Sequence, residues 1–267
     1  MRLLLGNHGQ FRAGVPAAAP AGPTPLVWYE FNDSTDADGT SANGGTLANS
    51  GSGGSALNAN IKGCTWTTGY TGRALKMVPI VVQANRDRIS TSTNSALNLT
   101  TGATLMFRAK FARDYFNRHA FFGLYDSPNV DNGGGNNVFE ITVRGSNSIT
   151  SSTQTNAKQV RCYIRTTSDN GSVKTDAANV TGSVDAWRHY CISYNGTNFI
   201  FYVDGASLFN TTGATGNFTS AGDLFISLGW VSFTNEASYF GWDGDIDDFR
   251  LYNSVLTATE IAAIAAQ

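Results

Sequence analysis

The fold is decided by "WRHYCISYNGTNFIFYVDGASL", residues 187–208, in which two apolar runs flank an Asn-Gly pair at 195–196. Side chains alternate between the two faces of an extended chain. Tyr190, Ile192 and Tyr194 therefore share one face, and the smaller or more polar residues between them share the other. Asn-Gly between such runs is a strong signal for a tight hairpin. This stretch predicts two antiparallel strands.

Similar runs recur on both sides of this hairpin, separated by clusters of Gly, Ser, Thr and Asn. Glycine is abundant, with 29 residues, and proline is scarce, with 6. That mixture is typical of short strands joined by turns. Because no helical segment intervenes, we expect an antiparallel sandwich or barrel. The predicted strands are 26–31, 88–92, 103–112, 119–126, 137–145, 159–167, 187–196, 198–208, 223–230 and 247–253.

One short helix is predicted at the C-terminus. Thr257 has the N-cap position and Glu260 follows three residues later, which is the capping-box arrangement. Leu256 and Ile261 have the spacing of a hydrophobic staple. Ile261 and Ile264 then share one face, so we expect the helix to pack against the sandwich.

The first 25 residues differ from the rest and form a predicted arm. They include "GVPAAAPAGPTP" at 14–25, a composition that favours an extended chain close to polyproline II. The N-terminus has three consecutive leucines, whereas a secretory signal needs an apolar region of about 7–15 residues. We therefore expect no signal peptide, an arm at 1–25 and a sandwich domain at 26–267.

Composition excludes two classes of partner. Charged residues make up 14% of the chain, the formal net charge is −2, and no dense Lys/Arg cluster occurs. A nucleic-acid partner would require a basic stripe, so none is expected. No run of about 18 apolar residues is present, so no membrane span is expected. The three cysteines, Cys64, Cys162 and Cys191, form no CxxC pair or Cys/His metal spacing, and we expect all three to be free.

Four segments, in order, resemble the laminin-G-like, concanavalin A-like jelly-roll family. They are "VWYEFNDSTDADGTSANGG" (27–45), "GYTGRALKM" with "DRISTSTNSALNLTTGATLMFRAKF" (69–77 and 87–111), "AWRHYCISYNGTNFIFYVDGASL" (186–208) and "GDIDDFRLYNSVLTATEI" (244–261). The resemblance implies an all-β, two-sheet antiparallel jelly-roll sandwich. It also implies binding of glycans or proteins, and frequently one calcium ion.

Calcium takes six to eight oxygen ligands, and the resemblance places the first and last strands near one another. The candidate ligands are Asp33, Asp36, Asp38, Asp247 and Asp248. In the alternative interpretation, the aspartates of 33–38 make turns through side-chain-to-backbone hydrogen bonds. Those of 243–248 then line a solvated strand edge, which discourages edge-to-edge pairing.

Catalysis is not expected. Glucanases that resemble this family carry paired glutamates and an aspartate along one strand, and glycoside hydrolysis needs two carboxyls. None of the four glutamates has a carboxylate two positions away within an aromatic strand. Asp243, Asp245 and Asp247 alternate, but Gly244 indicates a turn there. His189 is assigned a packing role, and no Gly-x-Ser-x-Gly motif is present.

Aromatic residues in or beside predicted loops are candidate ligand contacts, since a flat aromatic ring can pack against a sugar ring. They are Trp66, Tyr70, Trp230, Phe233, Tyr239, Phe240 and Trp242. The segment 229–242 is the densest, and we take Trp66, Trp230, Phe233, Tyr239 and Trp242 as candidate ligand contacts. In the alternative interpretation, the same rings close the ends of the core.

These observations favour a non-enzymatic display protein on the surface of a particle, and bacteriophage capsid decoration and fibre proteins resemble this plan. The arm would dock on particle or capsid subunits, and the sandwich would give weak adhesion to a glycan or host surface. The expected location is a virion surface or the extracellular space. The candidate anchors are Leu3, Leu4, Leu5 and Phe11. The alternative is a soluble or secreted carbohydrate-binding module, and a glycoside hydrolase ranks below both.

Overall fold

The structure is a computed structural model of the whole chain. It describes residues 22–32, 34–78, 87–99, 102–112, 119–125, 137–144, 159–166, 169–177, 185–212, 216, 218, 225–228, 230–231 and 240–267.

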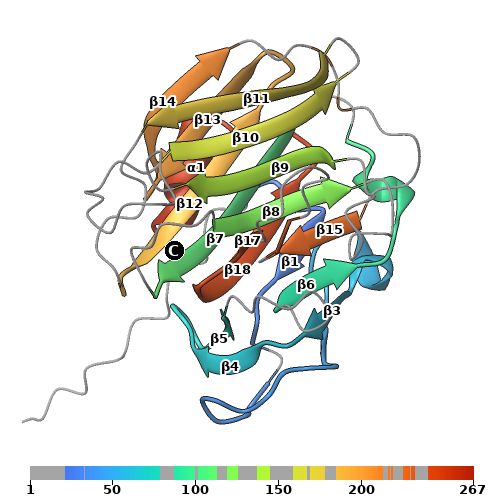
Figure 1. The fold of residues 1–267 in the computed structure, drawn as a ribbon, viewed down its shortest axis with the longest axis vertical. Helices are drawn as coiled ribbons and strands as arrows, with labels where there is room; N and C mark the ends of the chain where they lie inside the picture. The colour runs from blue at the N-terminus through green and yellow to red at the C-terminus, as the bar shows by residue number, and fades with distance from the viewer. Residues whose placement is uncertain are drawn as a thin grey trace, which may run out of the picture.

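Two large antiparallel sheets face each other, and Figure 1 shows one in front of the other. The first sheet has the strand order β14-β13-β12-β7-β18-β5-β4, and β1 also pairs with β18. Its strands are β1 (Val27–Tyr29), β4 (Thr65–Thr68), β5 (Arg73–Met77), β7 (Ala103–Phe111), β12 (Trp187–Tyr194), β13 (Asn198–Val203), β14 (Ala206–Thr212) and β18 (Gly244–Tyr252).

The second sheet has the order β11-β10-β9-β8-β15-β6-β3-β2. Its strands are β2 (Thr46–Leu47), β3 (Ala59–Lys62), β6 (Arg88–Thr91), β8 (His119–Tyr125), β9 (Asn137–Arg144), β10 (Gln159–Thr166), β11 (Asp169–Ala177) and β15 (Phe225–Leu228). A small ribbon pairs β16 (Trp230–Val231) with β17 (Phe240–Gly241), and η1 (Gly54–Leu57) and η3 (Ser95–Leu97) are short 3-10 turns. The predicted antiparallel sandwich is confirmed.

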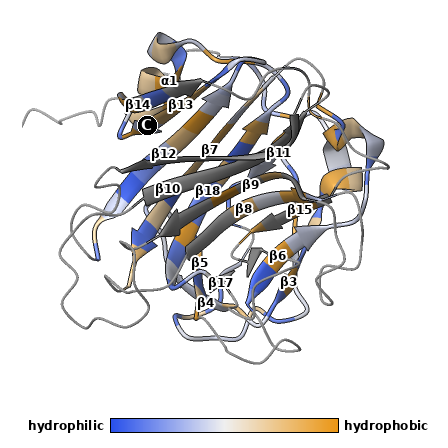
Figure 2. Cartoon of the chain, turned by 45° about the horizontal axis from the view of Figure 1, so that its top comes forward, coloured by the Kyte–Doolittle hydropathy of each residue, from blue (hydrophilic) through white to orange (hydrophobic). Residues whose placement is uncertain are grey.

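The core lies between the sheets, and the predicted alternation along β12 is confirmed. Tyr190, Ile192 and Tyr194 belong to this core, and hydrophilic and hydrophobic colours alternate along β7 and β12 in Figure 2. Aromatic rings join the two layers. The ring of Phe249 on β18 lies 5.9 Å from that of Phe122 on the facing sheet. Such pairs add to the free energy of burial through their preferred ring geometry.

Two tight turns shape the hairpins of 187–208. In the first, Asn195 Oδ1 accepts the backbone N–H groups of Thr197 and Asn198, and Gly196 has φ 90°. In the second, Asp204 and Gly205 have φ values of 50° and 77°. Positive φ at both central residues is the type I′ turn, whose twist matches that of the flanking strands. The single run predicted over 198–208 is therefore two strands joined by this turn.

The helix α1 (Ala258–Ala265) confirms the capping prediction. Thr257 Oγ1 accepts the backbone N–H of Glu260, and the carboxylate of Glu260 accepts the backbone N–H of Thr257 at 2.7 Å. Ile261 and Ile264 are buried with Cys191 in a second apolar cluster. Because Cys191 points away from the main core, α1 covers the outer face of the first sheet.

Two of the three cysteines confirm the prediction of free thiols. Cys64 and Cys191 are free and buried, and burial raises the pKa of both thiols. The side chain of Cys162 lies outside the described residues. Within the described ranges, no helix is long and apolar enough to cross a membrane.

Candidate functional site

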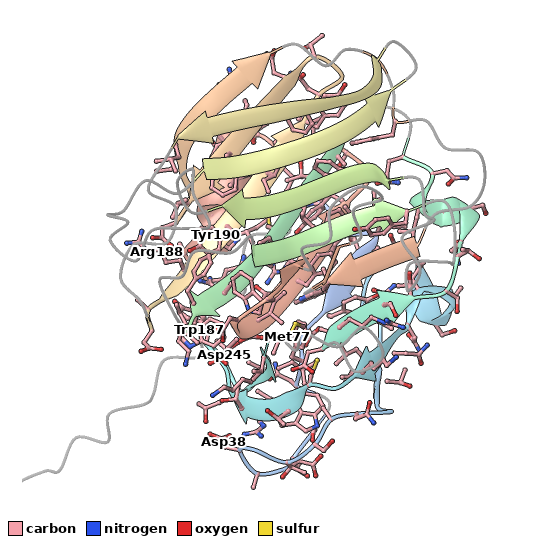
Figure 3. All side chains as sticks on the ribbon, viewed as in Figure 1. Asp38, Met77, Trp187, Arg188, Tyr190 and Asp245 are labelled. Atoms are coloured by element: carbon pink, nitrogen blue, oxygen red, sulfur yellow. The ribbon has the colours of Figure 1, made fainter. Side chains whose placement is uncertain are left out.

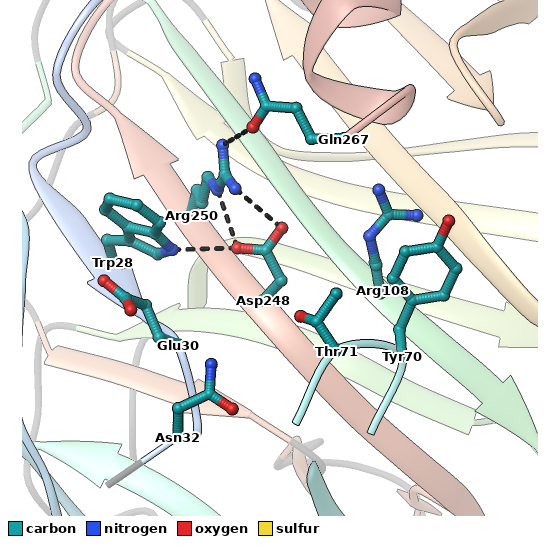
Figure 4. A pocket seen from close by; sticks show the side chains of 9 residues that line it. All are labelled: Trp28, Glu30, Asn32, Tyr70, Thr71, Arg108, Asp248, Arg250 and Gln267. Carbon is teal, nitrogen blue, oxygen red and sulfur yellow. Dashed lines mark hydrogen bonds and ion pairs between the residues drawn. The ribbon is translucent and has the colours of Figure 1, made fainter. Parts of the chain in front are cut away.

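The outer face of the first sheet carries a pocket of about 190 Å³ beside the C-terminal end of α1 (Figure 4). We call it the outer-face pocket. It brings together residues from β1 and the segment that follows it, the turn between β4 and β5, β7, β18 and the last residue of the chain. The lining residues are Trp28, Glu30, Asn32, Tyr70, Thr71, Arg108, Asp248, Arg250 and Gln267.

A bulge in β18 forms the floor of this pocket. The register with β7 shifts between Asp247 and Arg250, and Asp248 has φ 47°, a left-handed conformation that few residues other than glycine adopt. The bulge places the Asp248 carboxylate beside Trp28, whose Nε1 donates to Asp248 Oδ1 at 2.9 Å. Bulges commonly re-aim side chains in this way.

Asp248 also makes a bidentate ion pair with Arg250. Arg250 Nε and Nη2 donate to the two carboxylate oxygens at 2.8 and 3.0 Å. The guanidinium carbon of Arg250 lies 4.6 Å from the centroid of the Trp28 ring, within the range of a cation–π contact. The ion pair of Asp248 and Arg250, packed against Trp28, is therefore held by directed contacts and carries no net charge.

The turn that carries Tyr70 is held from below by Asp247. Asp247 is 0% exposed, and its Oδ2 accepts the backbone N–H groups of Tyr70 at 2.9 Å and Thr71 at 3.3 Å. Gly69 and Gly72 close the turn through a backbone hydrogen bond of 3.0 Å. Burial raises the pKa of Asp247 to about 7, although the backbone donors lower it.

Arg108 lies beneath the ring of Tyr70. Its guanidinium carbon is 3.8 Å from the ring centroid, and its Nη2 donates to the backbone carbonyl of Ala265 at 3.0 Å. Arg108 is 5% exposed, whereas Tyr70 is 45% exposed. The tyrosine therefore offers a ring face to solvent, and the arginine is a buried charge in the wall of the pocket.

A row of ionisable residues crosses the sheet at this level. The backbone register pairs His189 with Arg108, and Arg108 with Asp247. Burial, together with the Arg108 guanidinium, lowers the pKa of His189 to about 3. His189 is therefore neutral at physiological pH. Its Nδ1 is buried and has no hydrogen-bond partner among the described residues.

The predicted calcium ligands that lie within the described residues do not gather into one site. Asp33 lies outside the described residues, and Asp36 is exposed. Asp38 pairs with Arg73 at 2.6 Å and accepts Thr68 Oγ1 at 2.9 Å, on a loop away from Asp245 in Figure 3. These contacts lower the pKa of Asp38, chiefly through the hydrogen bond from Arg73.

The first and last strands do meet, as the resemblance implied, since β1 pairs with β18. The oxygens of Asp247 and Asp248, however, already accept N–H donors. Among the described residues, no three His, Cys, Asp or Glu side chains are grouped to hold a metal ion. These residues do not fit a calcium ion, and we derive no role for one from them.

The alternative interpretation of 243–248 also needs correction. These residues do not line a solvated strand edge, because β18 pairs with both β7 and β5. Asp243, Asp245 and Asp247 are all buried, and Asp245 pairs with Lys110 at 2.7 Å. Gly244 is the first residue of β18 and does not form the turn that we predicted.

The predicted ligand-contacting aromatics do not form a site in the described structure. Trp66 and Trp242 are 6% and 2% exposed and belong to the core, so neither ring face is available to a ligand. This is the alternative in which rings fill the core. Trp230 begins β16, and its side chain lies outside the description. Phe233 and Tyr239 lie outside the described residues, as do the arm anchors Leu3, Leu4, Leu5 and Phe11.

Sequence reasoning named Tyr70 as a loop aromatic, and the structure shows it exposed. It did not name Trp28, Arg108 or Arg250. Each of these three lies within an ordinary strand pattern, and only the pairing of β1, β7 and β18 brings them together. Arg108 directly follows the apolar residues 105–107 of a predicted strand, and this was the one available signal.

The described fold defines the class of the protein as a concanavalin A-like jelly roll, with two antiparallel sheets and a capped C-terminal helix. Residues 83–262 match the family described as the Concanavalin A-like lectin/glucanases superfamily. The match covers more than half of the chain, and the chain belongs to this family.

Solved structures share the fold at low identity. The binding domain of botulinum neurotoxin serotype G aligns with a TM-score of 0.60 and 10% identity, covering 91% of this chain and 50% of that one. The neurotoxin DC binding domain, in complex with rat synaptotagmin II, has values of 0.57 and 9%, covering 91% and 51%. This chain thus spans about half the length of these toxin domains.

Domain 4 of AbnA, a GH43 extracellular arabinanase from Geobacillus stearothermophilus, was solved in complex with arabinotriose. It aligns with a TM-score of 0.58 and 15% identity, covering 91% of this chain and 98% of that one. At these identities the likeness establishes the fold alone. No curated protein matches the sequence.

Proposed function

We propose that this chain is a glycan-binding module and that it binds a sugar ring in the outer-face pocket. The observation that carries this proposal is the exposed ring of Tyr70, held in position by the buried Asp247. A fixed aromatic face can cover the C–H patch of a sugar, while polar groups beside it bind the hydroxyls.

The polar groups of the pocket suit this role. Glu30 lines the pocket beside Trp28, and its carboxylate makes no hydrogen bond or ion pair with another described residue. It is therefore available to accept hydroxyl donors. The volume of about 190 Å³ is below the roughly 300–1,000 Å³ of pockets for drug-sized ligands, so it fits one ring of a longer glycan.

The comparison with the arabinanase domain supports a sugar as the ligand, since that domain has this fold and was solved with arabinotriose. The toxin domains support a more general binding role for the fold, because one was solved in complex with a protein, rat synaptotagmin II. A pocket with one exposed ring and several polar groups favours the sugar.

We propose binding without hydrolysis. Glycoside hydrolysis requires two carboxyl groups, one of which is protonated as the general acid or acts as a nucleophile. Asp248 is committed to its bidentate pair with Arg250. That leaves Glu30 as the carboxylate of the pocket lining without a described protein partner.

Display on a particle remains a prediction, as do a virion-surface or extracellular location and docking through Leu3, Leu4, Leu5 and Phe11. If several copies were displayed together, weak sugar contacts would become avid binding. The carbohydrate-binding alternative is the interpretation that the fold and pocket support better.

Affinity gel electrophoresis against a panel of soluble polysaccharides tests the proposal. The panel includes arabinan, galactan, polygalacturonate and its methyl ester, alginate and dextran sulfate. We expect at least one to retard the wild type and Tyr70→Ala to lose that retardation. Leu208→Ala is the control, because Leu208 is 42% exposed on β14 and outside the pocket. Retardation unaffected by Tyr70→Ala would contradict this site.

A further inference from the structure

The charge of Arg108 indicates the sign of the charge on the ligand. Arg108 is 5% exposed, and no carboxylate oxygen of a described residue pairs with its guanidinium. One described hydrogen bond, to the carbonyl of Ala265, uses its Nη2, although a guanidinium has five N–H donors. Buried charges in proteins are normally paired, so this one lacks its usual counterion.

The neighbouring groups do not supply that counterion. Asp248 is bound to Arg250 through both oxygens. Asp247 accepts three backbone N–H groups, from Tyr70, Thr71 and Asp248. Across the strand on the other side, His189 is buried and cannot neutralise a cation. The ring of Tyr70 covers Arg108 through a cation–π contact, which does not neutralise it either.

We propose that the outer-face pocket recognises an acidic sugar, and that Arg108 binds its anionic group, a carboxylate or a sulfate ester. This inference rests on the proposed glycan-binding function and specifies its ligand class. The planar guanidinium forms two parallel hydrogen bonds with such an oxyanion. Its burial strengthens that pairing, because water screens it less.

The pocket also sets the orientation of the sugar. In Figure 4, Arg108 and Tyr70 lie at one end, and Trp28, Glu30 and Asn32 lie at the other, with Asp248 and Thr71 between them. The carboxylate of Glu30 repels an anion from its own end. The anionic group of the ligand therefore lies at Arg108, and the neutral hydroxyls lie toward Glu30.

A comparison of polygalacturonate with its methyl ester tests this inference. The two polymers differ in the carboxylate alone, and binding is measured for the wild type, Arg108→Gln and Arg188→Gln. Arg188 is the matched control, because it is a half-buried arginine on the adjacent strand β12 that pairs with Asp204 at 2.9 Å. Dextran sulfate and dextran form the corresponding pair for a sulfate ester.

We expect the wild type to bind one charged polymer about tenfold or more tightly than its neutral counterpart, as the loss of a charge-assisted hydrogen bond predicts. Arg108→Gln makes the charged and neutral polymers equal, and Arg188→Gln leaves the difference intact. A difference seen only with dextran sulfate identifies the anion as a sulfate ester and supports the role of Arg108. Circular dichroism checks the fold of each variant. If Arg108→Gln does not fold, Arg108→Lys takes its place, and a preference for the charged polymer that survives Arg188→Gln but is unchanged in Arg108→Lys overturns the inference.

Two outcomes overturn the inference while leaving the proposed function standing. In one, charged and neutral polymers bind equally and Tyr70→Ala loses both. In the other, Arg188→Gln weakens binding as much as Arg108→Gln, which would mean a general surface charge effect. If no polysaccharide of the panel binds, the proposed function itself fails and the inference fails with it.

Discussion

The buried carboxylate of Asp247 accepts the backbone N–H of Tyr70 at 2.9 Å. Asp247 lies in the last long strand of the sandwich, and Tyr70 lies at the tip of a hairpin 177 residues earlier. One side chain from the bulged strand thus fixes the loop whose aromatic ring faces solvent. This relationship and the residues around it lead to five predictions.

Replacing Asp247 with alanine will loosen the turn and weaken glycan binding. The substitution leaves the N–H groups of Tyr70, Thr71 and Asp248 without their acceptor. Leaving such part-buried donors unsatisfied costs about 1–3 kcal/mol each, so we expect the free energy of unfolding in urea to fall by about 3 kcal/mol or more. Affinity for the bound polysaccharide should fall about tenfold or more. Asp36→Ala, at an exposed position, is the control, and equal effects of the two changes would contradict the role of Asp247.

His189 makes the fold sensitive to acid. Its pKa is about 3 in the folded chain and about 6.5 when unfolded, so the unfolded chain binds more protons between these values. The free energy of unfolding therefore falls as the pH is lowered from 6.5 toward 3, by up to roughly 4 kcal/mol. His189→Gln should remove this loss in urea titrations at each pH. An unchanged pH dependence in the variant would show that His189 is not the group responsible.

Asp247 changes the pH dependence of the free energy of unfolding in the opposite direction to His189, over nearly the same pH range. Its pKa is about 7 when folded and about 3.9 when unfolded, so here the folded chain binds more protons. Its contribution to the free energy of unfolding grows as the pH falls from 7 to about 4, and partly cancels that of His189. Asp247→Asn should therefore make the wild-type loss of stability at low pH steeper. A shallower profile would reverse the sign that we assign.

Gly244 is required by the packing of β18 on β7. Its φ is 149°, and a Cβ at this position would collide with the backbone carbonyl oxygen of Lys110. Gly244→Ala should lower the free energy of unfolding by about 3 kcal/mol. Gly39→Ala is the control, because Gly39 also has a positive φ, of 82°, but has open space around its Cβ. Gly39→Ala should lower the free energy of unfolding only by the backbone cost of about 1 kcal/mol. A similar decrease in both variants would contradict the steric explanation for Gly244.

Calcium should not change the stability of the sandwich. A bound ion at one hundred times its Kd would add about 2.7 kcal/mol to the free energy of unfolding. Because Asp38, Asp247 and Asp248 are committed to protein donors, we expect the Tm to be the same in excess calcium and in EGTA. A clear rise with calcium would revive the site predicted from the sequence, and Asp33→Asn would then be the variant to examine.

The amino-acid sequence by itself determined the local structure. The alternation of Tyr190, Ile192 and Tyr194, the Asn195-Gly196 turn and the Thr257 capping box all depend on neighbours a few residues apart. Backbone dihedral preferences and side-chain-to-backbone hydrogen bonds act over that range. The local sequence pattern was therefore enough to predict the strand alternation, the turn and the helix cap.

Only the tertiary structure decided the site. Trp28, Arg108 and Arg250 come from three separate strands. Tyr70 comes from the turn before β5, and all four meet because β1, β5 and β7 all pair with β18. The same pairing buries Trp242 and Asp247, which the sequence left open as loop or edge residues. Burial and charge pairing depend on which strands become neighbours across more than a hundred residues. That choice is made by the packing of the whole core, and no local pattern in the chain records it.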